Sequence, residues 1–250
     1  MKKNELLTVR HYFEKKPTSN ALIIAHRGGA KSFSNGENTL DVFLDAIQNQ
    51  VKMIEFDVRR TKDSQYIIFH DNKVDRKKIS SLTYSELAEI CSHKNIKVPL
   101  LIDTLQLCSK RVLFDIELKE TGYEREVIEI ISNYIDPSHY VITSFHDSVI
   151  RTIKQINPDI YTGLLLGKDK ATPLEHFSEL FPFGRLKKSK ADFVVPNYKL
   201  VTPWLVYKCR KLNYHIYVWT VNKNNVYLKL MKHKVTAIIT DYPDRFSGNY

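Results

Sequence analysis

The chain has 250 residues, of which 43% are hydrophobic and 26% charged, and its formal net charge is +10. This composition is typical of a soluble globular protein and excludes a disordered or collagen-like chain. The positive charge favours anionic partners such as phosphate compounds, nucleic acid or an anionic membrane surface, although a solvated lysine-rich surface explains it equally well. No apolar run has the length of a membrane-spanning helix, the N-terminus lacks the apolar core of a signal peptide, and three scattered cysteines indicate a reduced, cytoplasmic protein.

Apolar runs rich in Ile, Val, Tyr and Phe alternate with segments of helical periodicity along most of the chain. Asn38 is expected to cap the first of these helices, Thr83 and Glu86 form a capping box, and Thr202-Pro203 marks another helix start. Nine strands are predicted, at 21–26, 53–58, 66–70, 111–118, 140–145, 160–166, 192–196, 215–221 and 235–240.

Strands that alternate with helices predict a parallel sheet, either open and doubly wound or closed as a (β/α)8 barrel. Nine strands compete for the eight places of a barrel, and the connection from 58 to 66 is too short for a helical crossover. Thr61 to Ser64 has the composition of a turn, so we expect 53–60 and 65–70 to form a hairpin. The hairpin would return His70 to the carboxyl ends of the barrel strands, where the strand carrying Glu55 also ends.

We expect residues 1–250 to form a single catalytic barrel domain, with residues 1–20 as an N-terminal extension and 167–190 as a variable loop or helix. The segment 167–190 mixes phenylalanines and leucines with lysines. One hypothesis is that it contacts membrane surfaces or lipid-like substrates. The alternative, an amphipathic helix packed on the barrel, is the better supported of the two.

Two of the predicted strands carry ionisable residues at alternate positions, which places them on one face of each strand. Glu55 and Asp57 share a face in the first, and Asp115, Glu117 and Lys119 share a face in the second. Strands this apolar are normally buried on both sides, and an unpaired buried carboxylate is very costly. A bound cation is the simplest way to neutralise them.

Two histidines, His26 and His70, lie at strand ends near these carboxylates. Histidine titrates near neutral pH, so a pair of them beside a cation suggests acid–base catalysis. Taken singly, each is more often an ordinary strand-end or turn residue.

Several short motifs along the chain resemble those of a known protein family. In the order and spacing found here, they resemble those of the glycerophosphodiester phosphodiesterase family, from about residue 21 to the C-terminus. The motifs are Ala25-His26-Arg27-Gly28-Gly29, Glu37-Asn38-Thr39, Glu55-Phe56-Asp57-Val58, Thr61-Lys62-Asp63, His70-Asp71, Glu117-Leu118-Lys119, Val218-Trp219-Thr220-Val221-Asn222 and Ile238-Ile239-Thr240-Asp241-Tyr242-Pro243-Asp244.

The resemblance implies a TIM barrel with its active site at the carboxyl ends of the strands. It also implies a small-molecule substrate, a glycerophosphodiester, that is hydrolysed to sn-glycerol 3-phosphate and an alcohol. The cofactor would be one divalent cation, Mg²⁺ or Ca²⁺, held by Glu55, Asp57 and Glu117. Oxygen ligands suit such a hard cation, and three carboxylates leave positions for water and phosphate oxygens.

The same resemblance assigns His26 and His70 as general acid and base. Which is the acid, and whether water or the glycerol 2-hydroxyl attacks first, stays open. Arg27 and Lys119 would hold the phosphate oxygens, and Trp219 would line the glycerol end of the pocket. Lys119 serves equally well to neutralise Glu117, and a tryptophan on a strand is more often a core residue.

Three classes of function are compatible with these observations. The first is the glycerophosphodiester phosphodiesterase. The second is a phospholipase D-type enzyme that uses the same residues on lysophospholipids or sphingomyelin. The third is a non-enzymatic barrel that binds phosphate or nucleic acid, although no aromatic-basic nucleic-acid motif accompanies the charge.

Overall fold

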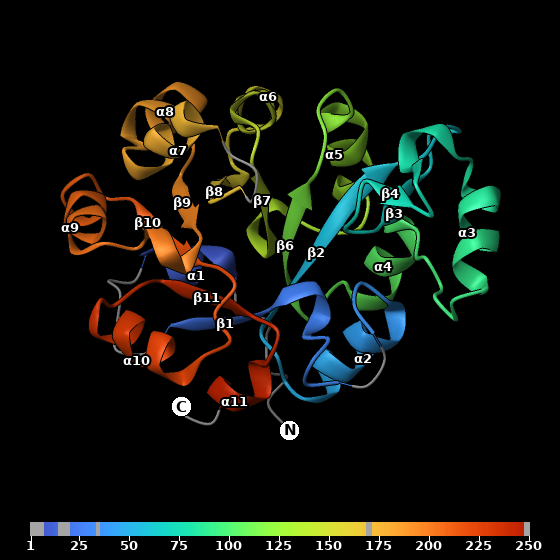
Figure 1. Ribbon diagram of the computed structural model, residues 1–250, viewed down its shortest axis with the longest axis horizontal. Helices are drawn as coiled ribbons and strands as arrows, with labels where there is room; N and C mark the ends of the chain where they lie inside the picture. The colour runs from blue at the N-terminus through green and yellow to red at the C-terminus, as the bar shows by residue number, and fades with distance from the viewer. Residues whose placement is uncertain (1–7, 15–20, 34–35, 169–171, 248–250) are drawn as a thin grey trace.

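Eight parallel strands close into a barrel, in which β1 pairs with both β11 and β2 (Figure 1). The computed structural model describes residues 8–14, 21–33, 36–168 and 172–247. Around the barrel the strands are β1 Leu22–Ala25, β2 Met53–Arg60, β6 Leu113–Leu118, β7 Tyr140–Ser144, β8 Tyr161–Leu166, β9 Phe193–Pro196, β10 His215–Val218 and β11 Ala237–Thr240. The (β/α)8 barrel predicted from the sequence is therefore confirmed.

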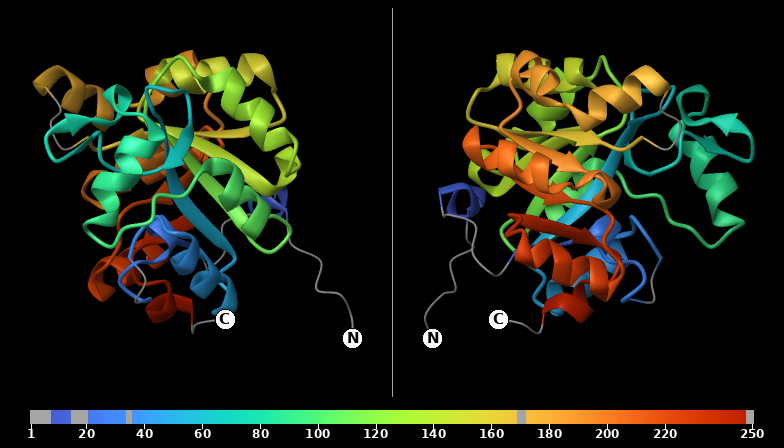
Figure 2. Two further views of the ribbon diagram at one scale, coloured as in Figure 1. Left: turned by 90° about the vertical axis from the view of Figure 1, so that its right-hand side faces the viewer. Right: turned by 60° about the vertical axis from the view of Figure 1, so that its left-hand side comes forward.

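The expected hairpin is present. β3, Tyr66–Ile68, pairs antiparallel with the end of β2, with Val58 opposite Ile68 and Arg60 opposite Tyr66. The chain then makes a short second hairpin, β4 Lys73–Val74 and β5 Lys77–Lys78, before α3. Figures 1 and 2 show this excursion projecting from one side of the barrel. His70 leaves β3 at the carboxyl end of β2, as the sequence predicted.

Helices follow the strands and cover the outside of the barrel. They are α2 Leu40–Gln48, α3 Tyr84–Ser92, α4 Leu101–Cys108, α5 Glu124–Ser132, α6 Asp147–Ile156, α7 Pro173–Leu180, α8 Phe183–Ser189, α9 Pro203–Lys211, α10 Asn224–Lys232 and α11 Pro243–Ser247. The capping box of Thr83 and Glu86 is present, and the Thr202 hydroxyl caps α9. The prediction that Asn38 caps α2 is wrong: Thr39 accepts from Val42 N, because the Asn38 amide is directed to a buried carboxylate.

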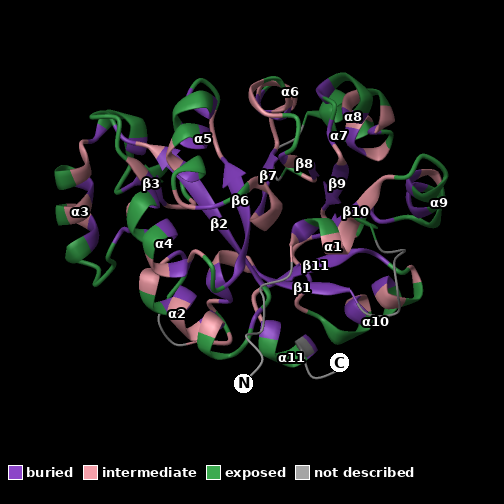
Figure 3. Ribbon diagram, turned by 180° about the vertical axis from the view of Figure 1, so that it is seen from behind, coloured by how far each residue is buried: buried purple, intermediate pink, exposed green. Residues whose placement is uncertain are grey.

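Burial follows the barrel geometry. The strands are buried along almost their whole length, and most helices bury apolar side chains, with α7 as an exception because its buried residue is Glu179 (Figure 3). In α6, for example, Val149, Ile150 and Ile153 are fully buried. The two faces of each strand therefore contact different groups, with the helices on the outside and the barrel interior on the inside.

A short helix, α1 Val9–Glu14, covers the amino-terminal end of the barrel. The ring of Phe13 stacks on Tyr161 at a centroid distance of 4.2 Å, and it also contacts Phe193 and His215. These three partners stand at the first residues of β8, β9 and β10. The N-terminal extension predicted over 1–20 is thus an end cover where it is described; residues 1–7 and 15–20 lie outside the described part.

The segment 167–190 forms two helices, α7 and α8, and residues 169–171 lie outside the described part. Several of its apolar side chains face outward: Leu174 is 79% exposed, Phe177 61% and Phe181 50%. Phe181 also contacts Trp204 of α9, with ring centroids 5.1 Å apart. Within the described residues, every helix is too short or too polar to span a lipid bilayer.

Candidate active site

A cavity of about 640 Å³ opens at the carboxyl ends of the barrel strands. Seven of the eight residues predicted from the sequence line it: His26, Arg27, Glu55, His70, Glu117, Lys119 and Trp219. The eighth, Asp57, is 1% exposed and lies just behind this lining, in contact with Arg27 and Lys119. The structure therefore brings the whole predicted set together in one place.

Three carboxylates form the centre of the site. β2 and β6 pair so that Glu55 lies opposite Asp115, and Asp57 lies opposite Glu117. One carboxylate oxygen from each of Glu55, Asp57 and Glu117 lies within 4.8 Å of the others. All three residues are buried, and all three offer oxygen, the donor that hard divalent cations prefer. The group can therefore hold a metal ion.

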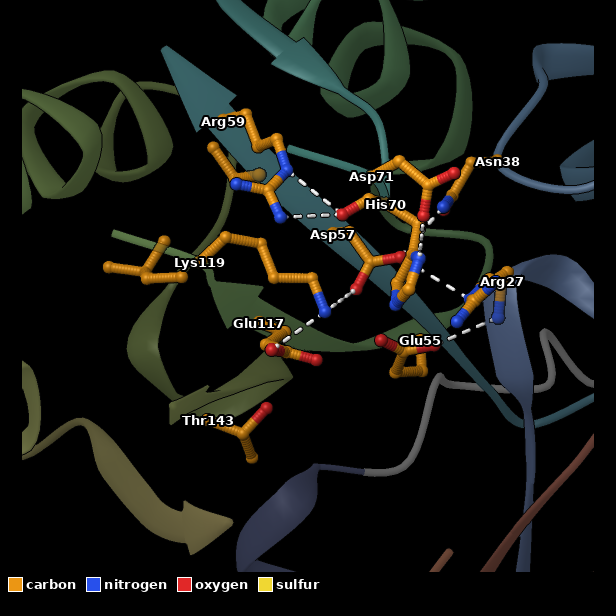
Figure 4. A network of polar contacts seen from close by, with 12 residues as sticks. Arg27, Asn38, Glu55, Asp57, Arg59, His70, Asp71, Glu117, Lys119 and Thr143 are labelled. Atoms are coloured by element: carbon orange, nitrogen blue, oxygen red, sulfur yellow. Dashed lines mark hydrogen bonds and ion pairs between the residues drawn. The ribbon is translucent and has the colours of Figure 1, made fainter. Parts of the chain in front are cut away.

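Two cations approach this cluster from opposite sides (Figure 4). Lys119 Nζ lies 2.8 Å from Asp57 Oδ1 and 2.8 Å from Glu117 Oε1. Arg27 Nε lies 3.5 Å from Asp57 Oδ2, and the Asn38 amide donates to the same oxygen at 2.8 Å. Despite the opposing effect of burial, the charges of Lys119 and Arg27 hold the pKa of Asp57 well below its usual range. Asp57 is thus ionised and fixed in place.

The other two carboxylates are not fully compensated. Burial, and after it the negative charges of Asp57 and Glu117, raises the pKa of Glu55 well above its ordinary value. Burial also raises the pKa of Glu117, although Lys119 opposes the shift. Lys119 is held in its charged form, because Glu117 and Asp57 outweigh burial and raise its pKa to about 12. Lys119 and Arg27 together bring two positive charges to three carboxylates, which leaves a negative charge for a bound divalent cation to neutralise.

Asp115 lies one layer deeper in the barrel than Glu117 and is fully buried. Its Oδ1 accepts a hydrogen bond from the Thr143 hydroxyl at 2.8 Å, and its Oδ2 has no partner among the described residues. Burial, and to a lesser degree the charges of Glu117 and Asp57, raises the pKa of Asp115 to about 7. The sequence placed Asp115 on this face without a role, and the structure places it beneath the carboxylate cluster.

The turn after β1 brings its own backbone to the site. Arg27 N donates to Glu55 Oε2 at 2.8 Å. This requires a tight turn, in which Arg27 has φ 50° and Gly28 has φ 87°. A Cβ at Gly28 would lie 2.6 Å from Val42, so the position needs glycine for space as well as for its backbone conformation. A non-glycine residue at positive φ, as Arg27 is, stores strain of a kind that is common in functional sites.

His26 is oriented by a carboxylate from the far end of the chain. Its Nδ1 lies 2.6 Å from Asp241 Oδ1, and Asp241 Oδ2 accepts from the Asn222 amide at 2.7 Å. Although burial opposes it, the hydrogen bond and charge of His26, with help from Lys31, keep the pKa of Asp241 well below its usual range. An ionised carboxylate only accepts hydrogen bonds, so Nδ1 of His26 carries the hydrogen. His26 Nε2 is then free for chemistry, 4.0 Å from Glu55 Oε2.

His70 is oriented by its neighbour in sequence. Its Nδ1 lies 2.8 Å from Asp71 Oδ1, and Arg59 donates to the His70 carbonyl from Nε at 2.9 Å. Burial, together with the charge of Lys119, lowers the pKa of His70 below its ordinary value of 6.5. Its imidazole therefore favours the neutral form at neutral pH.

The opposite wall of the cavity is apolar. It consists of Phe145, Leu165, Trp219 and Ile239. The Trp219 indole donates from Nε1 to the Val195 carbonyl at 2.9 Å, and its ring contacts Phe145 edge-on. The cavity thus has one charged wall, which suits a phosphate and a cation, and one apolar wall, which suits carbon.

A comparison of the sequence with models of known protein families identifies the family of this chain. The model of the glycerophosphoryl diester phosphodiesterase family matches residues 26–245. The chain belongs to this family. It is accordingly an enzyme, a phosphoric diester hydrolase, and the non-enzymatic alternative raised by its charge no longer stands.

Individual relatives agree with this assignment. A glycerophosphodiester phosphodiesterase from Caldanaerobacter subterraneus is 28% identical over 89% of this chain and 95% of its own. A lysophospholipase D from Mus musculus is 24% identical over 89% of this chain and 83% of its own. The solved structure of a phosphodiesterase from Oleispira antarctica, in complex with the product sn-glycerol-3-phosphate, superposes with a TM-score of 0.76. That structure is 22% identical, covers 91% of this chain and 96% of the other, and confirms the fold.

Several residues of this phosphodiesterase site had no role in the sequence analysis. Asp241 and Asn222 lay within the family motifs but were not connected to His26. Asn38 was expected to cap a helix, yet its amide binds Asp57. Phe145 follows β7 directly, and its place at a strand's carboxyl end is the signal that could have identified it.

Proposed function

We propose that the chain hydrolyses glycerophosphodiesters to sn-glycerol 3-phosphate and an alcohol, with His26 and His70 as the two proton carriers. The observation that carries this proposal is the buried trio of Glu55, Asp57 and Glu117, in one cavity with both histidines. A phosphodiester is an anion with a poor leaving group, so its hydrolysis needs compensation of charge and a proton for the departing oxygen.

Glu55, Asp57 and Glu117 are the proposed ligands of one divalent cation, Mg²⁺ or Ca²⁺. The all-oxygen donor set and the uncompensated negative charge of the cluster support this choice. When bound, such a cation supplies Lewis-acid stabilisation of the charge on the phosphate oxygens.

The two histidines have different proposed roles. His70 acts as the general base, because its lowered pKa keeps the ring neutral and able to accept a proton from the attacking hydroxyl. His26 acts as the general acid, because its hydrogen bond from Nδ1 to Asp241 fixes the ring and leaves Nε2 beside the carboxylate cluster to carry the proton. In the overall reaction an oxygen–phosphorus bond forms, the bond to the alcohol oxygen breaks, and that oxygen leaves with the proton from His26.

Arg27 and Lys119 are the proposed anchors of the phosphate oxygens. Both side chains are largely buried, and both face the carboxylate cluster, so a phosphate there would meet two fixed positive charges. The apolar wall with Trp219 would hold the carbon skeleton of the glycerol. Lys119 also balances the charge of Glu117, a role that is compatible with holding the phosphate.

The test is a set of glycerophosphodiesters supplied with Mg²⁺ or Ca²⁺ and assayed for release of sn-glycerol 3-phosphate. We expect hydrolysis that exhaustive chelation abolishes and that either metal restores. Glu117→Gln should raise the metal concentration needed for half activity by about 10–100-fold, by analogy with losses at metal sites. Glu89→Gln, on the exposed side of α3, is the control and should behave as wild type. Activity that survives chelation, or no hydrolysis of any diester, would refute the proposal.

A second candidate is a lysophospholipase D activity on lipids with one acyl chain. The mouse relative bears that name, and the exposed side chains of Leu174, Phe177 and Phe181 offer apolar area for a lipid or a membrane surface. Choline release from lysophosphatidylcholine at a rate similar to that from glycerophosphocholine would favour it. Flotation with anionic liposomes would test the membrane contact: a chain that stays at the bottom of the gradient does not bind them.

A further inference from the structure

A second cavity of about 450 Å³ adjoins the active-site cavity. It lies between α6, α7 and α8, on the side where β7 and β8 end. Phe145, His146 and Lys168 line both cavities. A substrate whose phosphate lies at the carboxylate cluster can therefore extend its other half into this second space.

The carboxylates that line the second cavity are already engaged by other groups of the protein. Asp147 pairs with Arg185, whose Nε lies 3.1 Å from Asp147 Oδ1. Glu175 accepts from Thr172 N at 2.7 Å as part of a capping box. Glu179 Oε1 accepts from two backbone amides, the nearer of them Gly167 N at 2.9 Å. Each of the three therefore has partners within the protein, and the charges of Lys168 and Arg185 add to the hydrogen bonds with Thr172 in lowering the pKa of Glu175.

Among the described residues, three cationic side chains of the same cavity lack such hydrogen-bond and ion-pair partners. The guanidinium of Arg151 and the ammonium groups of Lys168 and Lys188 also line it. Within the described part of the chain, none of the three forms an ion pair or a side-chain hydrogen bond. The charges of Arg151 and Lys188 are therefore available to an anionic ligand.

A further polar atom indicates what else the ligand carries. Glu179 is 4% exposed, and its Oε2 has no hydrogen-bond partner among the described residues. A buried carboxylate oxygen without a donor is costly, and a ligand hydroxyl would satisfy it. The cavity thus combines free positive charge with one free acceptor, a combination that fits a phosphorylated polyol.

We infer that the second cavity binds the alcohol half of the substrate, and that it selects diesters in which this half is a polyol bearing a second negative charge. This inference rests on the proposed function, since it names the substrate class for that same reaction. A cationic alcohol such as choline would instead need free carboxylates or an aromatic cage. Here Asp147 and Glu175 are engaged by other groups of the protein, the free Glu179 Oε2 is a single buried oxygen, and Phe145 and Trp219 offer only one edge-on aromatic pair.

The test compares three diesters at low ionic strength: glycerophosphoglycerol, its terminally phosphorylated form, and glycerophosphocholine. Loss of each diester is followed by phosphorus NMR with the full-length, metal-supplied enzyme. We expect the phosphorylated diester to have a KM about tenfold lower than the neutral one, which is the usual size of one charge-assisted contact. Hydrolysis of none of the three would refute the proposed function; hydrolysis with equal KM values would refute only this inference.

Variants locate the effect in the second cavity. Arg151→Met and Lys188→Met, made singly and together, should raise KM for the phosphorylated diester about tenfold more than KM for glycerophosphoglycerol. Lys187→Met is the matched control, because Lys187 is the exposed neighbour of Lys188 on α8 and lies outside the cavity. A preference that survives the double variant, or that Lys187→Met removes equally, would overturn the assignment.

Discussion

His26 and His70 line the same cavity, but they are held in different ways. The partner of His26 is Asp241, 215 positions away in sequence, and their side chains are only 15% and 13% exposed. The partner of His70 is Asp71, the next residue, and these side chains are 36% and 73% exposed. One pair is part of the closed barrel, and the other stands on a connection at its rim.

This difference predicts which of the two histidines depends more strongly on its carboxylate partner. Asp241 is itself fixed by the Asn222 amide and by Lys31, so the His26 ring has its orientation set before substrate arrives. The His70 ring is held mainly through its backbone, since Arg59 binds its carbonyl, while its carboxylate partner is largely in solvent. We therefore expect catalysis to be sensitive to the partner of His26 and tolerant of changes in the partner of His70.

The largest effects should come from the histidines themselves. His26→Gln and His70→Gln should each lower kcat by about 10²–10⁴-fold, the usual contribution of one general acid or base. Steady-state kinetics on glycerophosphoglycerol measures this, and thermal unfolding confirms that the variants are folded. His93→Gln, at an exposed position, is the control. Full activity in either variant would remove that histidine from the mechanism.

Asp241→Asn should have the next largest effect. The amide keeps the shape of the side chain but removes the carboxylate that fixes the hydrogen on Nδ1 and the orientation of the His26 ring, so kcat should fall on the order of 10²-fold. KM should change little, because Asp241 is a positioning residue. The pH dependence of kcat should also change, whereas the loss of a purely structural contact would leave it unaltered. An equal fall in the affinity for substrate would instead indicate a binding role.

The pH dependence tests the role of His70. Burial and the charge of Lys119 place its pKa below 6.5, and a general base must be neutral to act. As the pH is lowered, kcat/KM should therefore stay level down to that point and then fall about tenfold per pH unit, as His70 becomes protonated. An acid limb whose position is the same in His70→Gln as in the wild type would contradict the assignment of His70 as base.

The smallest effect is expected for Asp71→Asn. An exposed contact of this kind contributes up to about 1 kcal/mol, so the rate should fall at most about fivefold. Because the hydrogen bond that Asp71 accepts raises the pKa of His70, its loss should also move the acid limb of the pH profile to lower pH. If Asp71→Asn and Asp241→Asn lowered kcat equally, the contrast between the two histidines would be wrong.

Much of the fold was predictable because its signals are local. All eight barrel strands and the β2–β3 hairpin appeared as apolar runs of the right length, with ends that differ by at most a few residues. The β4–β5 hairpin was not predictable, since its strands have two residues each and include three lysines. Asn38 and Thr39 are both good helix caps, and only the tertiary contact of Asn38 with Asp57 decides between them.

The site was predictable where one strand carries its residues. Alternation along two predicted strands placed Glu55 with Asp57, and Asp115 with Glu117 and Lys119, whereas the choice of Glu117 as a metal ligand came from the family resemblance. The pairing of His26 with Asp241 was not predictable in this way, because only closure of the barrel between β11 and β1 brings them together. The second cavity was not predictable either. It forms where three helices pack together, and the periodicity of a sequence gives no distances between helices.

The helix α1 has a practical consequence for handling this enzyme. Because Phe13 covers the barrel at the starts of β8, β9 and β10, α1 lies at the end of the barrel opposite the active-site mouth. An enzyme attached to a solid support through α1 would therefore present its mouth to the solution. Such a tether makes substrate entry and surface attachment independent of each other, which suits a flow reactor or a biosensor for glycerophosphodiesters.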